Sequence, residues 1–201
     1  MARRTASLHK EYEKLLKEYG PQAWWPMRRG FAPKEWEVCV GAILTQNTNW
    51  RNVEKALDNL IKSNVVTPEA TLKISSRRLE QLVRPSGFYR QKAIRLKTLA
   101  QFILSYGSFN DFKRIERHEL LKVKGVGPET CDSILLYACG RPYFVIDSYT
   151  KRFVRSLGME PANYEALRAH FESRLPKDVA LYKEFHALIV EWGKRKTRTK
   201  L

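Results

Sequence analysis

The residues best suited to chemistry lie between Leu120 and Asp147, where a glycine turn, two lysines and a carboxylate follow one another. In Gly125-Val126-Gly127-Pro128 the glycines allow left-handed or crowded backbone, and the proline can begin a helix because its missing N–H costs nothing there. Free amides at such a turn point outward together and bind anions. With Lys122 and Lys124 alongside, we predict that the turn binds a DNA phosphate. The alternative is a tight connection between two helices.

Asp147 is the candidate acid. It ends the apolar run Tyr143 to Ile146 and precedes a predicted helix that opens with Ser148 or Tyr149. Asp is a favoured N-cap and the helix dipole stabilises its carboxylate, so Asp147 can simply begin that helix. A carboxylate held ionised at a helix start also suits stabilisation of positive charge that develops on a nucleotide sugar. The two roles are compatible.

The elements that must position these residues are helices. Apolar residues recur at helical spacing nearly throughout, and strand signals are limited to the short run 143–146, so we predict an all-α fold. The predicted helices cover 8–19, 34–46, 51–61, 68–74, 76–83, 90–106, 117–123, 128–138, 148–157, 164–175 and 179–193. The last residues, 194–201, are expected to form a basic tail.

The charge balance favours a polyanionic partner. Among 201 residues, 37 are Lys or Arg and 21 are Asp or Glu, which gives a net charge of +16. The alternative is a basic but solvated surface. No apolar stretch approaches the ~20 residues of a membrane span, so we expect no membrane partner and a cytoplasmic protein, nucleoid-associated if prokaryotic. Cys39, Cys131 and Cys139 lack metal-site spacing, and we expect no metal and no cofactor.

Four features in order resemble the helix-hairpin-helix DNA glycosylases of the endonuclease III type. They are the glycine hairpin, the position of Asp147 twenty residues after Gly127, the segment Leu44 to Thr48 and the segment Gly87 to Ala93. The resemblance spans 34–193. It implies two helical lobes with double-stranded DNA in the cleft between them, bound by a monomer that cleaves the N-glycosidic bond of a damaged base. The implied lobes are 1–33 with 108–201, and 34–138, which overlap over 108–138.

The resemblance also implies residue roles. Asp147 becomes the catalytic aspartate, and Gln46 matches the residue that fills the gap left by a flipped nucleotide. Glu129 stands where strand-cutting members carry a lysine nucleophile, and a carboxylate cannot form the Schiff base of lyase chemistry. The four-cysteine cluster that follows the last helix of many members is also missing. We therefore expect a monofunctional enzyme without an iron-sulfur cluster. The expected DNA-phosphate contacts are Lys122, Lys124, Gly125, Val126, Gly127 and Lys151.

Aromatic residues indicate the substrate. Trp24-Trp25-Pro26 in an early loop and Trp50 after Thr-Gln-Asn-Thr look like the 3-methyladenine glycosylase branch of this family, and we expect them to line the base pocket. Flipped bases are recognised by stacking and edge contacts. An N-alkylated purine is cationic, so an aromatic cradle favours it by on the order of 1 to 2 kcal/mol when desolvated. The alternative for these tryptophans is ordinary core packing.

The expected reaction is removal of an alkylated purine such as 3-methyladenine by base flipping, which leaves an abasic site. One alternative is a glycosylase for uracil or thymine mismatched with guanine, or for oxidised pyrimidines. Adenine removal is disfavoured because Gly41 stands where that branch places a glutamate. A further alternative is a non-catalytic protein that uses the hairpin only to hold DNA.

Overall fold

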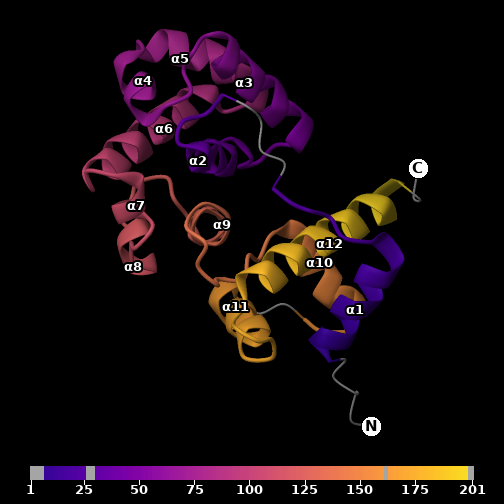
Figure 1. Cartoon of the computed structure of the whole chain (residues 1–201). Helices are drawn as coiled ribbons and strands as arrows, with labels where there is room; N and C mark the ends of the chain where they lie inside the picture. Colours follow the sequence, from indigo (N-terminus) through magenta and orange to yellow (C-terminus); the bar gives the residue numbers. More distant parts are fainter. Residues whose placement is uncertain (1–6, 26–29, 161–162, 199–201) are drawn as a thin grey trace. The chain divides into compact units, whose positions relative to one another are not determined.

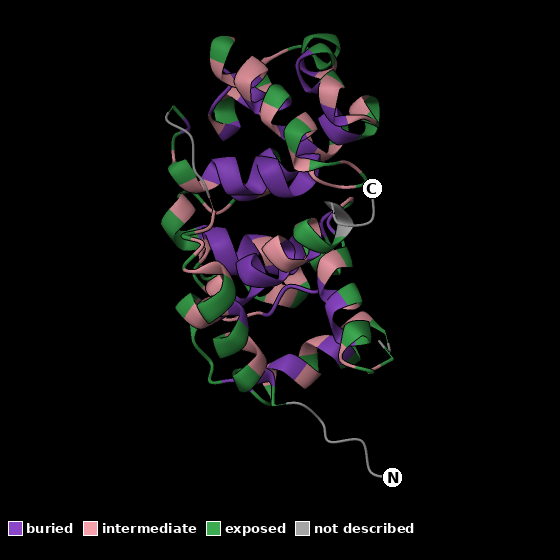
Figure 2. Cartoon of the chain, turned by 90° about the vertical axis from the view of Figure 1, so that its right-hand side faces the viewer, coloured by how far each residue is buried: buried purple, intermediate pink, exposed green. Residues whose placement is uncertain are grey.

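The computed structural model describes residues 7–25, 30–160 and 163–198. Within these ranges the chain forms helices and no β-strand, which confirms the predicted all-α class (Figure 1). Buried and exposed residues alternate along most of the helices, as the amphipathic pattern of the sequence requires (Figure 2). In the part of the chain that is described, no helix is both long and apolar enough to cross a membrane.

The chain divides into two compact units. The first combines Met1–Pro26 with Arg141–Leu201, and the second is Met27–Gly140. The first unit is therefore built from two segments that are distant in sequence. Residues 108–138, which both predicted lobes shared, lie in the second unit, and the lobe boundaries expected at 33 and 138 fall at 26 and 140.

The second unit is organised around α2 (Lys34–Leu44), whose residues from Trp36 onward are all buried. This explains why the segment is apolar on every side. Helices α3, α6 and η2 pack against α2. The other elements of this unit are α3 (Trp50–Lys62), α4 (Pro68–Lys73), α5 (Ser76–Val83), η1 (Arg84–Ser86), α6 (Tyr89–Leu104), α7 (Phe109–Phe112), α8 (Arg117–Leu120), α9 (Pro128–Ser133) and η2 (Ile134–Ala138).

The first unit packs α1 and α10 against α12. Its core is aromatic: the rings of Phe144 and Phe171 stack with centroids 4.2 Å apart, and Phe185 contacts both of them. Such pairs add to the stabilisation that burial alone provides. The helices of this unit are α1 (Leu8–Tyr19), α10 (Ser148–Ser156), α11 (Tyr164–Glu172) and α12 (Val179–Arg198).

The C-terminal helix is longer than predicted. Gly193 was expected to end it, but α12 continues to Arg198, so the predicted basic tail is helical as far as the structure describes it. Two contacts support this extension: Arg195 Nε donates to Glu191 Oε1 over 2.7 Å, and the Arg195 guanidinium lies 4.8 Å from the Tyr19 ring centroid. Gly193 itself lies against Tyr149 so closely that a Cβ there would overlap the ring.

Other boundaries differ from the sequence pattern. The predicted helix 128–138 is α-helical only to Ser133 and then widens into the π-helical turn η2. The helices expected to end at 46, 123 and 175 end instead at Leu44, Leu120 and Glu172, and the short helix α7 was not predicted. The run 143–146 is extended but pairs with no strand in the described ranges.

Candidate active site

Asp147 begins α10 as its N-cap. Its Oδ1 accepts hydrogen bonds from the Thr150 backbone N–H over 2.7 Å and from the Thr150 hydroxyl over 2.9 Å. Its Oδ2 lies 3.6 Å from Nε2 of His186, a residue of α12. The Asp147 side chain is only 15% exposed and that of His186 only 6% exposed, so this pair lies largely out of solvent. The N-cap role is therefore present, and it leaves the second oxygen directed at a histidine.

The carboxylate of Asp147 is held in its ionised form. Burial raises the pKa of this group, but the neighbouring imidazole of His186, together with the Thr150 amide and hydroxyl, lowers it. The net result is a pKa below the usual value of an aspartate. At neutral pH the site therefore presents a negative charge in a poorly solvated place, where electrostatic interactions are strong.

One of the predicted base-pocket tryptophans, Trp24, lies beside this pair, and Trp25 lies beside Trp24. The rings of Trp24 and Trp25 are 5.3 Å apart, and the Trp24 ring meets the His186 ring edge-on at 5.9 Å. Both tryptophans are half-buried. The structure thus brings Trp24, His186, Asp147 and Thr150 together in the first unit, and we call this set the carboxylate cluster. Pro26 lies outside the described residues, and Trp50 is the first residue of α3 in the second unit, also half-buried.

Gln46 follows α2 in the second unit, and its side chain lies on the glycine hairpin. Its Nε2 donates to the Gly125 carbonyl over 3.0 Å and to the Thr130 hydroxyl over 2.9 Å. The Arg95 guanidinium donates to Gln46 Oε1. We call Gln46, Arg95, Gly125 and Thr130 the hairpin cluster. Its hydrogen bonds join three segments that are far apart in sequence.

The hairpin connects α8 to α9. Gly125 has φ 93°, in the region that favours glycine, and a Cβ there would overlap the Arg95 side chain. Gly127 has φ −87° and open space around it, so only one of the two glycines needs the left-handed conformation that the sequence pattern allowed to both. Arg117 of α8 and the fully buried Asp132 of α9 form a two-pronged ion pair at 2.6 and 3.1 Å.

The charged residues of the hairpin reach solvent. Lys122, Lys124 and Glu129 are exposed, and Val126 is buried beneath the turn, where its amide donates to the Val123 carbonyl over 3.0 Å. Lys151, on α10 in the first unit, is half-buried. The two hairpin lysines are therefore accessible to an anion, whereas the Val126 amide is already bonded to the Val123 carbonyl and is not one of the free amides that the sequence predicted.

Sequence reasoning missed Lys92, whose side chain binds the backbone just before Gln46. Its side chain is fully buried, and Nζ donates to the Leu44 carbonyl over 2.7 Å and to the Ser86 carbonyl over 2.6 Å. Burial, together with the charge of Arg95, lowers the pKa of Lys92 to about 8. A signal was available, since position 92 falls four residues before buried Leu96 and shares its face of α6.

Sequence reasoning also missed His186. It is spaced with Tyr182 and Ile189 on the apolar face of α12, which correctly indicates burial. Nothing in that spacing identifies Asp147, thirty-nine positions earlier, as its neighbour. Thr150 was detectable, because an N-cap residue accepts hydrogen bonds from the third residue of its helix.

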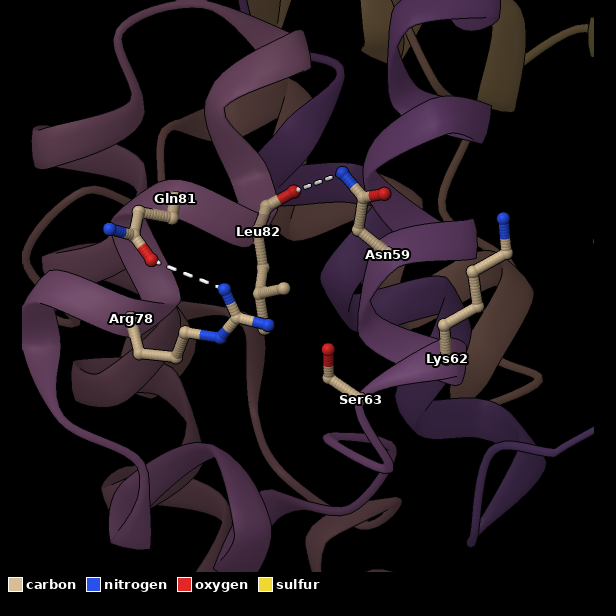
Figure 3. A pocket seen from close by; sticks show the side chains of 6 residues that line it. All are labelled: Asn59, Lys62, Ser63, Arg78, Gln81 and Leu82. Carbon is tan, nitrogen blue, oxygen red and sulfur yellow. Dashed lines mark hydrogen bonds between the residues drawn. The ribbon is translucent and has the colours of Figure 1, made fainter.

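A hollow lies between α3 and α5, in the second unit. Its volume is about 310 Å³, and Figure 3 shows that Arg78 donates to Gln81 on one side while Asn59 donates to the Leu82 carbonyl on the other. It contains none of the predicted site residues. Within the described ranges, no group of three or more His, Cys, Asp or Glu side chains is arranged to hold a metal ion.

Comparison with known sequences gives matches over most of the chain. A family model described as HhH-GPD superfamily base excision DNA repair protein matches residues 40–177. A Methanocaldococcus jannaschii protein provisionally named as a DNA repair glycosylase is 46% identical over 96% of this chain and 90% of its own length. The endonuclease III of Thermotoga maritima is 30% identical over 79% of this chain and 72% of its own length.

Comparison with solved structures gives a similar result. The crystal structure of an H. pylori 3-methyladenine DNA glycosylase bound to 1,N6-ethenoadenine matches with a TM-score of 0.82 and 35% identity. The match covers 94% of this chain and 98% of that protein.

Proposed function

This chain belongs to the HhH-GPD superfamily of base excision DNA repair proteins, and from that premise we propose that it is a DNA glycosylase that removes alkylated purines from double-stranded DNA. The observation that carries the proposal is the state of Asp147: a nearly buried carboxylate, ionised, fixed at a helix start and facing His186, whose ring meets the half-buried Trp24. The similarity to a 3-methyladenine glycosylase supports the alkylated purine as substrate.

The proposed chemistry follows from that charge. When the bond between base and sugar stretches, positive charge develops on the deoxyribose, and a fixed carboxylate stabilises it without reorganisation. Asp147 also accepts the proton of the attacking water, or orients that water. The products are the free base and a strand that bears an abasic site.

Substrate choice is proposed to come from Trp24, Trp25 and Trp50. A purine alkylated at N3 or N7 carries positive charge, so it stacks on an indole more favourably than the neutral base does. A cationic base also leaves without prior protonation. The site therefore needs no acid on the base, and its carboxylate and aromatic walls suffice.

The second unit is proposed to hold the DNA. Lys122, Lys124 and the hairpin backbone bind strand phosphates, and Lys151 of the first unit adds a further contact. Gln46 fills the space that the flipped nucleotide leaves. To do so, its side chain exchanges its hydrogen bonds to Gly125 and Thr130 for contacts with the duplex.

We also propose that the enzyme has no lyase activity. The second residue of α9 is Glu129, and a carboxylate forms no Schiff base with the abasic sugar. Treatment with borohydride during the reaction is then expected to trap no covalent protein–DNA product. A trapped product would contradict this part of the proposal.

The first prediction concerns Asp147→Asn. Because Asn is also a favoured N-cap, the fold should persist while the charge is lost. Single-turnover excision is expected to fall by at least ~10³-fold, the order of loss seen when a transition-state charge loses its partner. The substrates are duplexes with one lesion each: 3-methyladenine, 7-methylguanine, ethenoadenine, and uracil or thymine opposite guanine.

A matched control is Asp111→Asn, which neutralises an exposed carboxylate on α7. It should excise normally, and the Asp147 variant should still bind abasic DNA. Near-normal excision by the Asp147 variant would refute the catalytic role. If the unaltered enzyme prefers mismatched uracil or thymine, the proposal that its substrate is an alkylated purine would be refuted.

A further inference from the structure

We propose that His186 is a positioning residue that fixes the second oxygen of Asp147 and supports the ring of Trp24, so that the acid and one wall of the base pocket are set by the same side chain. The inference rests on the function proposed above, which gives Asp147 and Trp24 their roles. His186 itself touches neither sugar nor base in this scheme.

The carboxylate of Asp147 is held from two directions. Thr150, within the same helix, binds Oδ1 through its amide and its hydroxyl. His186, from α12, faces Oδ2 at 3.6 Å. Two different elements thus limit rotation of the carboxylate about its Cβ–Cγ bond. With the imidazole removed, the Thr150 contacts hold one oxygen and leave the orientation of the other to solvent.

The imidazole is placed by a rigid part of the fold. His186 is buried, and its neighbour Phe185 packs edge-on against Tyr12, Phe144 and Phe153 at centroid distances of 5.5 to 6.1 Å. This aromatic packing fixes the α12 backbone at that turn. A side chain carried there can hold its partners to the tolerance of a few tenths of an ångström that a reacting group requires.

The same ring meets Trp24. The Trp24 and His186 rings are inclined by 66° with centroids 5.9 Å apart, the edge-to-face arrangement that aromatic pairs favour. Trp24 follows α1 on a loop, so this contact is one of those that give its indole a defined place. His186 therefore fixes the position of Trp24, which is proposed to stack on the base, relative to the Asp147 carboxylate, which is proposed to face the sugar.

A histidine that only fills space would differ from this in its electrostatics. Within the described residues, the groups that act on the pKa of Asp147 are His186 from α12 and Thr150 from its own helix α10, against burial, which raises it. Removing the imidazole but keeping a ring therefore shifts the titration of Asp147 upward. Simple loss of packing would lower stability without that shift.

The test uses two substitutions in the full chain. His186→Phe keeps an aromatic ring against Trp24 and removes both nitrogens, whereas His186→Gln keeps an N–H donor and removes the ring. The Asp147 carboxyl carbon is titrated by ¹³C NMR in the free protein, single-turnover excision is measured across pH, and KM is measured from steady-state rates at several substrate concentrations. His9→Phe, at an exposed position of α1, is the matched control.

For His186→Phe we expect a higher pKa of Asp147, an acidic limb of the rate profile displaced to higher pH, and excision slower by roughly 10- to 100-fold, the loss typical of a misplaced reacting group. For His186→Gln we expect the limb to stay near that of the unaltered enzyme while KM rises, because Trp24 loses its support. The control should match the unaltered protein in both measurements.

Three outcomes would overturn the inference: an unchanged Asp147 titration in His186→Phe, equal losses in both variants with no displaced limb, or no loss in either. If His186→Phe fails to fold, the KM of His186→Gln tests the inference: a raised KM supports it, and an unchanged KM contradicts it. The titration needs no substrate, so it separates the two proposals. Suppose that the Asp147 titration shifts in His186→Phe while Asp147→Asn excises normally. That result would refute the proposed function but would still support the coupling between His186 and Asp147.

Discussion

The carboxylate cluster and the hairpin cluster are both built around one functional side chain, but different forces hold them. Asp147 is a charged group, nearly buried and paired with His186, and its local hydrogen bonds come from within three residues. Gln46 is neutral and partly exposed, and its partners Gly125 and Thr130 lie 79 and 84 residues away in sequence. One cluster fixes a charge, and the other joins distant segments.

This difference matches the tasks proposed for them. A carboxylate that stabilises a transition state must be in place beforehand, because reorganisation during the reaction would cancel its benefit. A side chain that enters the duplex must leave its resting partners, and the hydrogen bonds of Gln46 to Gly125 and Thr130 are neutral, so water or bases can replace them at small net cost. The carboxylate cluster therefore suits a fixed group, and the neutral Gln46 suits a side chain that changes its partners.

The largest effect in the second unit is expected from Gly125→Ala, which breaks the hairpin cluster and leaves the carboxylate cluster intact. The added Cβ would overlap Arg95, and φ 93° is strained for alanine, so we expect a stability loss of about 1 to 3 kcal/mol. Affinity for abasic DNA should fall roughly tenfold, which corresponds to ~1.4 kcal/mol. Denaturant unfolding and binding titrations measure the two losses.

The matched control for this variant is Gly127→Ala, two residues away. Gly127 has φ −87° and no atom within 4 Å of an added Cβ, so alanine should be tolerated there and the backbone amide is kept. Equal damage from the two substitutions would mean that the Arg95 contact is not what makes Gly125 special.

A smaller effect is expected from Lys92, whose charge has the opposite sign to that of Asp147. The pKa of Lys92 is lowered from 10.5 to about 8, so between these values the unfolded chain binds more protons than the folded one, and stability rises with pH. We expect the unaltered protein to gain about 2 kcal/mol over Lys92→Met between pH 7 and pH 9.5. Asp147 behaves oppositely: its lowered pKa gives stability above its unfolded pKa that is lost as pH falls through its folded pKa.

Urea denaturation of the unaltered protein and Lys92→Met at several pH values measures this difference. A stability gap that stays constant from pH 7 to pH 9.5 would show that Lys92 does not lose its proton in the folded state. Leu96→Ala, on the same face of α6, serves as a control, because it removes packing and should give a gap independent of pH.

The smallest effect is expected from the exposed lysines of the hairpin. The double variant Lys122→Gln, Lys124→Gln should weaken DNA binding to the same extent for every sequence, and the slope of log affinity against log salt should fall by about 0.9 per lost phosphate contact. Lys10→Gln with Lys17→Gln on α1 changes the net charge equally at exposed positions. If both pairs change the slope alike, overall charge and not the hairpin attracts the DNA.

Much of the fold was predictable because it follows from local rules. The N-cap role of Asp147, the turn at Gly125 and most helices come from spacing and residue type within a few positions. The resemblance to helix-hairpin-helix glycosylases also rested on short motifs, and the family match confirms it.

What could not be predicted depends on residues far apart in the chain. The pairing of His186 with Asp147, the buried contacts of Lys92 and the resting place of Gln46 on the hairpin are set by tertiary packing. The end of α12 was missed for the same reason: glycine usually ends a helix, but at Gly193 the nearby Tyr149 ring makes it necessary inside one.

That glycine has a wider bearing. Tyr149 comes two residues after Asp147 on α10, and Gly193 lies two turns beyond His186 on α12. Because no side chain intervenes where the two helices meet, the helices approach as near as a ring against bare backbone permits. Any larger residue there would act as a wedge, and the gap it opened would be passed along both helices to the imidazole and the carboxylate. The distance between the His186 imidazole and the Asp147 carboxylate thus depends on the absence of a side chain at position 193.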